Sequence, residues 1–454
     1  MVYNKERRMR DRKSRFLKLG VRLSLLAGVS FFLLVWGNMA VAGPKITLKP
    51  MVTVAGKYDS NFYGVEKGER GVYTLLVQPG IKVGMVMPKT SVEFAYTLEG
   101  YVYQDSSTVP KGQRKASDLN YIGHLFNLAL NYQPTRRLNL GLTDSFYMTR
   151  YPYYYDRLTT IIDKRKYWIN RFSPNIFYDF KNRLSAGLRY DWRRIRYDKD
   201  EVEEVGEGTF YGDSDSHELG LAVGYNPTRT TTLDFDYKYM QLEYVDGMLA
   251  ENDYKMHWFM LQGQKRYKYF AFDAGIGWQT RDYPNDTAVQ TNDDFTFKLG
   301  ITGQSPPPSE RRRHLGRVFL RPMDHFYLGW IRMPSTYGEY YTADRFTLSV
   351  GNLFYDRINV QLRGWYQISD YNEFTGITAG GGTETRYDET FDASARVGYL
   401  FTDVLALNLT GGRQERDSNL SGYGYINNYA ILSLDFNYDI GARGGFVREA
   451  MYYW

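Results

Sequence analysis

The sequence predicts an all-β fold, a transmembrane antiparallel up-and-down β-barrel of about eighteen strands. Three observations predict it. Side chains alternate in polarity from about residue 46 to residue 440, the N-terminus has the pattern of a secretory signal, and the connections between alternating segments are short and long in turn. A side-chain period of two is that of a strand and excludes a helix.

The alternation assigns each side chain to one of two faces. In 392–401 one face reads Ala-Ala-Val-Tyr-Phe and the other begins Asp-Ser-Arg-Gly, and the segments 184–191 and 295–302 alternate in the same way. In a barrel these faces meet lipid and lumen. We therefore expect five apolar side chains to face lipid: Leu188, Phe235, Phe297, Leu362 and Leu434. We also expect their neighbours one position away, such as Thr296, to tolerate an arginine.

Residues 1–42 have the order of a secretory signal peptide. Nine Lys or Arg residues lie between Lys5 and Arg22, a mostly apolar stretch follows at 23–36, and Ala-Val-Ala at 40–42 supplies small residues for cleavage. The apolar stretch, about 14 residues, is too short to span a bilayer as a helix. We expect cleavage after Ala42, which leaves 43–454 as one outer-membrane barrel domain. An uncleaved inner-membrane anchor is the alternative.

Removing the signal changes the charge balance. The chain has 57 Lys and Arg and 51 Asp and Glu, whereas 43–454 keeps 48 and 49, a formal net charge of −1. The basic excess therefore belongs to the signal and gives no reason to expect nucleic acid as a partner. Cysteine is absent, which excludes a disulfide framework and a thiolate metal site. The 42 tyrosines predict aromatic girdles at the two membrane interfaces.

Eighteen strands are expected in chain order. Their ranges are 46–58, 72–86, 90–104, 119–132, 137–150, 166–179, 183–197, 215–225, 230–244, 252–264, 269–281, 292–303, 322–333, 341–354, 358–370, 386–400, 403–415 and 426–438. Short turns alternate with longer polar loops at 105–118, 151–165, 198–214, 282–291, 371–385 and 416–425. Short periplasmic turns and long outer loops are the rule for bacterial barrels, and an even strand number places both termini in the periplasm.

One connection breaks this rule. By parity 304–321 is a periplasmic turn, yet it contains three consecutive prolines at 306–308 followed by Glu-Arg-Arg-Arg at 310–313. The prolines exclude that part from a sheet interior. Either two short strands lie around 316–320, or the segment is a periplasmic protrusion. The strand count depends most on this connection, and sixteen strands are the alternative to eighteen. The final aromatic strand is expected to end at Tyr438 rather than in the tail 439–454.

Several short motifs resemble a known family. Pro50 lies on the first strand, 58–62 reads Tyr-Asp-Ser-Asn-Phe, 78–81 reads Gln-Pro-Gly-Ile and 92–96 reads Val-Glu-Phe-Ala-Tyr. In these features the chain resembles the exopolysaccharide-operon outer-membrane barrels, the β-barrel porin 2 family. The resemblance implies a part in export or assembly of an extracellular polysaccharide. Ser60 departs from it, since an acid is often expected there.

No constellation of residues points to catalysis, a metal or a cofactor. The five histidines are far apart and lack metal-ligand spacing, and Gly-Gly-Gly at 380–382 lacks the Lys-Ser/Thr of a phosphate loop. The acidic run 198–207 has no EF-hand order, so we expect a solvated loop, with divalent cations shared with lipopolysaccharide as the alternative. We do not expect the protein to be an enzyme. The rival class is an outer-membrane hydrolase, in which a nucleophile and a histidine distant in sequence would meet at the barrel rim.

The polar face is expected to line a pore. The candidate pore-lining residues are Arg189, Asp191, Arg193, Asp234, Asp236, Lys238, Lys298, Arg363, Asp392, Arg396 and Asp435. Charges of both signs in a water-filled channel tune ion selectivity and bind sugar hydroxyls. The expected function is a polysaccharide-export pore, with a general diffusion porin for small polar solutes as the alternative. Expected partners are outer-membrane lipid, lipopolysaccharide, the barrel-assembly machinery, polysaccharide and periplasmic export components.

Overall fold

The computed structural model describes 44–438 apart from 112, 151–163, 181–182, 199–211, 246–250, 268–269, 286–290, 305–324, 337–339, 356 and 378–381. The expected signal peptide, the polyproline connection, most of the acidic run, part of the triple glycine and the tail 439–454 therefore lie outside the described residues. Among those described, no helix is long and apolar enough to cross a membrane.

Eighteen strands account for most of the described chain. They are β1 Lys45–Asp59, β2 Val72–Val86, β3 Thr90–Asp105, β4 Tyr121–Tyr132, β5 Leu138–Thr149, β6 Tyr167–Asp179, β7 Leu184–Tyr197, β8 Ser214–Thr228, β9 Thr231–Tyr244, β10 Tyr254–Arg266, β11 Phe270–Asp282, β12 Thr291–Gln304, β13 His325–Pro334, β14 Thr342–Phe354, β15 Ile358–Ile377, β16 Thr383–Leu400, β17 Leu405–Ser418 and β18 Tyr425–Asn437. The expected number of strands is confirmed.

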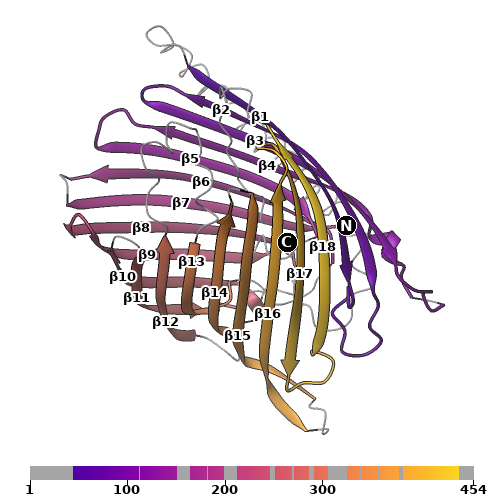
Figure 1. Ribbon diagram of the computed structural model, residues 1–454. Coiled ribbons are helices and arrows are strands. Elements are labelled where there is room, and N and C mark those ends of the chain that lie inside the picture. The colour runs from indigo at the N-terminus through magenta and orange to yellow at the C-terminus, as the bar shows by residue number, and fades with distance from the viewer. Residues whose placement is uncertain are drawn as a thin grey trace, which may run out of the picture.

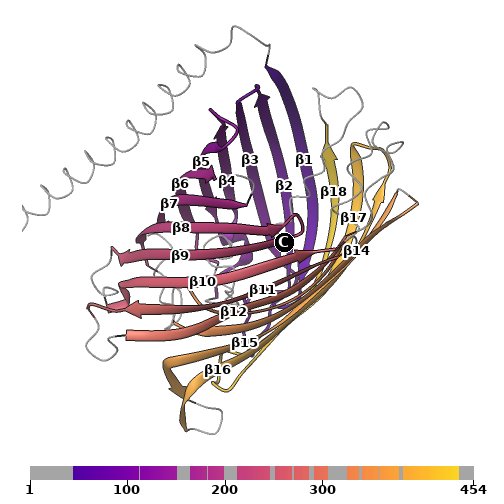
Figure 2. The same cartoon turned by 90° about the vertical axis from the view of Figure 1, so that its left-hand side faces the viewer.

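Each strand pairs antiparallel with its neighbours in sequence, and the first pairs with the last. On β1, Met51 lies opposite Asn437 and Asp59 opposite Tyr429 of β18. Figures 1 and 2 both place indigo β1 beside yellow β18, so the sheet closes on itself. Closure leaves no strand edge unpaired, which is the condition for a sheet to cross a bilayer. The fold is the closed antiparallel barrel that the alternation predicted.

The outward face of the barrel is apolar. Leu188, Phe235, Leu362 and Leu434 are 46%, 41%, 52% and 42% exposed. Polar residues next to them in sequence, such as Arg189, Asp234 and Asp435, are less exposed. Outward aromatic residues lie both in mid-strand, as Phe259 does, and at strand ends, where the rings of Tyr178 and Phe180 meet at 4.7 Å. A surface of exposed large apolar side chains with aromatic ends suits lipid rather than water.

Two expected loops are shorter than predicted. Residues 371–385 were expected as a loop, but β15 continues to Ile377 and β16 already begins at Thr383, with a shift in register between Asp370 and Thr375. The bulge adds residues to one strand, which bends it and lets pairing continue past the change in pattern. Strand β17 likewise runs to Ser418, into the expected loop 416–425.

The inward face is not uniformly polar. One apolar cluster lies on β6, β7, β9, β10 and the end of β11: Tyr167, Ile169, Ile195, Met240, Leu242, Tyr254, Met256, Trp258, Met260 and Tyr283. A second lies on β1 to β4 and β18 and includes Ala116 and Leu119 of the 3₁₀ helix η1 Ala116–Leu119, which packs against β3. Inward residues of both clusters are buried, so the wall carries apolar patches beside its charged ones.

Candidate functional site

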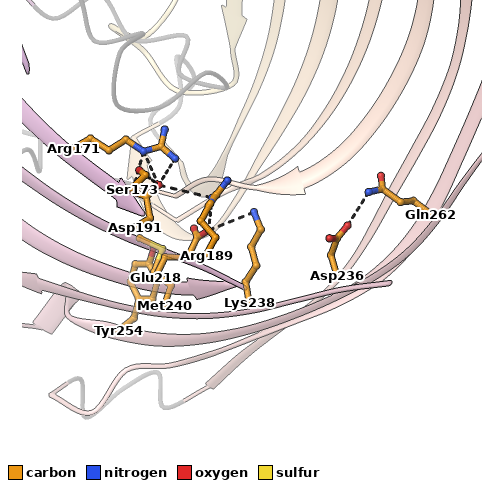
Figure 3. Close-up of polar contacts among 10 residues, drawn as sticks. All are labelled: Arg171, Ser173, Arg189, Asp191, Glu218, Asp236, Lys238, Met240, Tyr254 and Gln262. Carbon is orange, nitrogen blue, oxygen red and sulfur yellow. Dashed lines mark hydrogen bonds and ion pairs between the residues drawn. The ribbon is translucent and has the colours of Figure 1, made fainter. Parts of the chain in front are cut away.

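An inward network of charged side chains crosses the wall from β6 to β9. Arg171 on β6 donates through Nε to both carboxylate oxygens of Asp191 on β7, at 2.9 and 2.7 Å, and Ser173 Oγ donates to the same carboxylate at 2.8 Å. These side chains point into the space that the sheet encloses (Figure 3). The Asp191 side chain is only 3% exposed, and its cost of burial is offset by charged and neutral hydrogen bonds.

The network continues across β7, β8 and β9. Arg189 Nη2 donates to Glu218 Oε1 at 2.8 Å, and Lys238 Nζ lies 3.8 Å from the same oxygen. Arg189 Nη2 also lies 3.9 Å from Asp191 Oδ2, so the two acids join three cations in one row. The period of two places Arg189 and Asp191 on one face, and the strand register puts Glu218 opposite Asp191.

Solvent reaches the cations of this row from inside the barrel. The side chains of Arg171, Arg189 and Lys238 are 40%, 43% and 36% exposed, although they lie on the inward face. Exposure on the inward face requires room for water next to these cations. The arrangement can therefore attract and coordinate polar solutes inside the barrel wall.

An apolar patch borders the row on the β10 side. Lys238 Nζ lies 4.7 Å from the centre of the Trp258 ring, within the range of a cation–π contact. Tyr254 and Met240, drawn beside the row in Figure 3, belong to the apolar cluster of β6 to β11. Asp236, next on the inward face of β9, accepts a hydrogen bond from Gln262 of β10 at 2.7 Å. The wall thus presents charge, amide and aromatic surface on adjacent strands.

Other predicted residues form smaller inward pairs on the remaining wall. Lys298 Nζ lies 3.0 Å from Asp273 Oδ2, and Arg396 Nη2 lies 3.7 Å from Asp435 Oδ2. Thr53 donates to Asp435 at 2.7 Å across the β1–β18 seam that closes the barrel. The first pair joins the adjacent strands β11 and β12, whereas the second reaches across β17 from β16 to β18.

All eleven candidate pore-lining residues occupy inward positions of their strands. The inward positions are those of Arg189, Asp191 and Arg193 on β7; Asp234, Asp236 and Lys238 on β9; Lys298 on β12; Arg363 on β15; Asp392 and Arg396 on β16; and Asp435 on β18. The structure brings Arg189, Asp191 and Lys238 into one network and places the others along the wall. That they line an open pore stays a prediction.

Sequence reasoning missed four members of the site, Arg171, Ser173, Glu218 and Gln262. Each lies at an inward position in phase with the predicted residues, and Glu218 is the residue directly opposite Asp191 in the strand register. Arg171 was the harder case, because Pro174 and Asn170 blur the alternation on β6. The pairing of strands brings these residues together, and the register of that pairing cannot be read from the sequence alone.

Tyrosines are found inside the barrel as well as in the outward girdles. The Tyr101 and Tyr121 rings stack at 4.8 Å with an interplanar angle of 8°, and Tyr103 stacks on Tyr101 at 5.9 Å. These three are 3%, 7% and 3% exposed, because η1 and the neighbouring strands cover them. They fill the wall on this side and do not offer free ring faces.

Three histidines lie on the outward face and each meets a tyrosine hydroxyl. The distances from Nδ1 to the hydroxyl are 2.8 Å for Tyr96 and His124, 2.6 Å for Tyr190 and His217, and 3.0 Å for Tyr237 and His257. Among the described residues no three His, Cys, Asp or Glu side chains are grouped to hold a metal ion.

No protein-family model matches the chain, and no curated protein does either. Several solved structures have a similar shape, among them the outer membrane protein OpdK of Pseudomonas aeruginosa. Acinetobacter baumannii OccAB2 is 8% identical with a TM-score of 0.49 and OccAB4 is 12% identical with a TM-score of 0.45, each over 87% of this chain and 98% of theirs. Pseudomonas aeruginosa OpdK with vanillate is 11% identical with a TM-score of 0.45, over 86% and 98%. Likeness at this distance identifies no function.

Proposed function

We propose that the protein is an outer-membrane pore that passes small polar and charged solutes. The observation that carries the proposal is the exposure of Arg171, Arg189 and Lys238 on the inward face, 36% to 43%, inside a closed barrel whose outward face is apolar. Charged side chains kept wet inside a lipid-compatible cylinder provide a path for solutes that lipid excludes.

The barrel's size supports a channel of this kind. Eight strands leave room only for packed side chains or one small ligand, whereas barrels of about 16–18 strands leave an aqueous channel. This barrel has eighteen strands. Its inward apolar clusters are buried, whereas the cations of the row from β6 to β9 are exposed, so we expect passing solutes to meet this row.

Polysaccharide export, which the family resemblance implies, is the second candidate. Inward tyrosines with free ring faces would support it, because aromatic rings stack on sugar rings. The stacked Tyr101 and Tyr121 are covered, however, and offer no free ring face to a sugar chain. Small-solute passage therefore has the better support, and partners in an export apparatus stay a prediction that surface polysaccharide in a deletion strain would test.

The pore is tested by conductance and reversal potential in a planar bilayer. We expect Arg189→Glu to shift selectivity towards cations and Glu218→Lys to shift it towards anions, because each reverses one charge of the same pair. Arg413→Glu is the control, since Arg413 faces outward beside Glu415. A folded protein that does not conduct would overturn the proposal, as would equal shifts for the inward and outward variants.

A further inference from the structure

A carboxylate faces outward in the middle of the apolar band. Asp144 on β5 and Asn170 on β6 occupy outward positions, and Asn170 Nδ2 donates to Asp144 Oδ1 at 3.3 Å. The outward side chains around Asp144 are apolar: Leu128, Leu142, Phe146 and Phe172. Beside Asn170, Arg194 of β7 also faces outward and is paired with Asp215 at 2.7 Å. Both polar side chains are partly exposed on that face.

The strand register fixes the depth of the pair. Asp144 lies opposite Leu128 of β4 and Phe172 of β6. Phe172 stands between Trp168 and Tyr178, outward aromatics near the two ends of β6. Aromatic residues mark the two membrane interfaces, so Asp144 lies within the hydrocarbon layer if the barrel has the membrane location proposed above.

Further polar side chains extend this part of the surface. Tyr96 on β3 and His124 on β4 face outward and are joined by the hydrogen bond described above. Leu98 lies opposite His124, and His124 lies opposite Met148 of β5, so the two polar pairs lie on four consecutive strands. We name Tyr96, His124, Asp144 and Asn170 the lateral polar patch.

Lipid cannot satisfy such a patch. Ionisable and amide side chains within the hydrocarbon layer are costly, and they are retained where another protein surface pairs with them. On the opposite wall of the barrel the outward residues include Leu348 and Leu362, which lipid solvates well. Outward Tyr–His pairs also lie on β7 to β10, so the Asp144 carboxylate is the feature that distinguishes the wall from β3 to β6 and indicates a cover other than acyl chains.

We propose that the lateral polar patch is the contact surface for a second copy of this chain. The patch carries an acceptor, the Asp144 carboxylate, directly beside a donor, the Asn170 amide. A two-fold axis through the pair would place each Asn170 against the other chain's Asp144, which makes the surface self-complementary. The apolar side chains around the pair then pack against their own counterparts.

Cysteine cross-linking tests this contact, because the chain has no cysteine of its own. Leu142→Cys places one thiol two residues from Asp144, near the proposed axis. Leu348→Cys places one on β14, an outward position 45% exposed on the far wall. Oxidation of outer membranes that contain the full-length protein should give a disulfide dimer with Leu142→Cys and only monomer with Leu348→Cys. A difference in electrophoretic mobility between unboiled and boiled samples shows that each variant is folded.

A second change separates the polar pairing from chance collision. In the Leu142→Cys background, Asp144→Leu should abolish the dimer while the barrel still folds, since leucine is compatible with lipid. Asp144→Asn should retain the dimer, because it keeps an oxygen acceptor. A monomer with Leu142→Cys, equal dimer from both cysteine positions, a dimer that survives Asp144→Leu, or a cross-link to a different protein would each overturn the proposal. Conductance of the Asp144→Leu monomer tests the pore separately.

Discussion

Arg171 and Asp191 join neighbouring strands through two hydrogen bonds from the Nε of Arg171, at 2.9 and 2.7 Å. The two side chains differ in their exposure to solvent. The guanidinium is 40% exposed and the carboxylate 3%. The carboxylate therefore depends on its partners, whereas the arginine can be hydrated from the lumen. This difference decides what each substitution should do.

Asp191→Asn should lower the free energy of unfolding by about 1–2 kcal/mol, because it replaces charge-assisted hydrogen bonds from Arg171 with neutral ones. The freed arginine keeps access to water, so the cost stays below that of a stranded buried charge. Urea-induced unfolding in lipid vesicles, followed by tryptophan fluorescence, measures it.

Asp234→Asn is the matched control. Asp234 is also an inward acid, and the described residues place no cation within ion-pair distance of it. An equal loss in both variants would show that the network around Asp191 adds nothing to stability.

The two faces of β12 give a second test. Leu299 is outward and 48% exposed, so Leu299→Arg should cost about 2–4 kcal/mol where the chain crosses the membrane. Lys298→Arg, one residue away on the inward face, keeps the charge and should cost little. Vesicle unfolding measures both, and equal losses would mean that the register is shifted by one residue.

Thr296 corrects the simpler expectation that any inward neighbour tolerates an arginine. It is inward, as predicted, but 0% exposed, and Trp258 Nε1 donates to its hydroxyl at 3.3 Å. Thr296→Arg would therefore overpack a covered site and destabilise the barrel as well, for a different reason. The periodicity of the sequence assigns a face, but it does not show which inward positions are covered.

The same distinction explains how much of the fold was predictable. Alternation and turn lengths located all eighteen strands, because backbone pairing and lipid exposure act on every residue of a strand. The extension of β15 to Ile377 was missed, since beyond the lipid no apolar face is required and the pattern weakens. The helix η1 was missed for a different reason, because its place depends on packing against β3.

The candidate site was predictable only in part. Asp191 and Lys238 were identified from their own strands, whereas Arg171 and Glu218 join them through hydrogen bonds across strands that are distant in sequence. The inward apolar patch around Trp258 was not expected. In the sequence each of its residues is a single apolar side chain on a mostly polar face, and only the fold shows that they lie together. The alternation assigns each residue to a face of the barrel, but only the pairing of strands shows which residues on that face are in contact.

Asp253, in the connection between β9 and β10, makes the stability of the protein depend on pH. Burial raises the pKa of its carboxyl above the ordinary 3.8, against hydrogen bonds from the Tyr244 amide at 2.6 Å and from Asn285 Nδ2 at 3.1 Å. Because the folded pKa is the higher one, this group's contribution to stability is complete below 3.8 and is lost as the pH rises through the raised pKa.

Asp253→Asn should therefore flatten the fall in stability with rising pH over that window, since asparagine does not titrate. The unfolding midpoint of the wild type minus that of the variant, measured across acidic pH, isolates the group. A difference that does not change with pH would show that the folded carboxyl titrates as it does in the unfolded chain.

Arg363 and Arg396 test the wall that faces the row of charges on β6 to β9. Both are inward, Arg396 beside Asp435 at 3.7 Å and Arg363 near Asp392 on the adjoining strand. Replacing both with glutamate should shift the reversal potential towards cations, because it changes the wall by four negative charges without altering the outward face. Mobility before and after boiling confirms folding, and replacing both with lysine should leave selectivity near that of the wild type. If the double glutamate variant conducts with unchanged selectivity, these two arginines do not line the path, and solutes pass along the opposite wall beside Arg189 and Lys238.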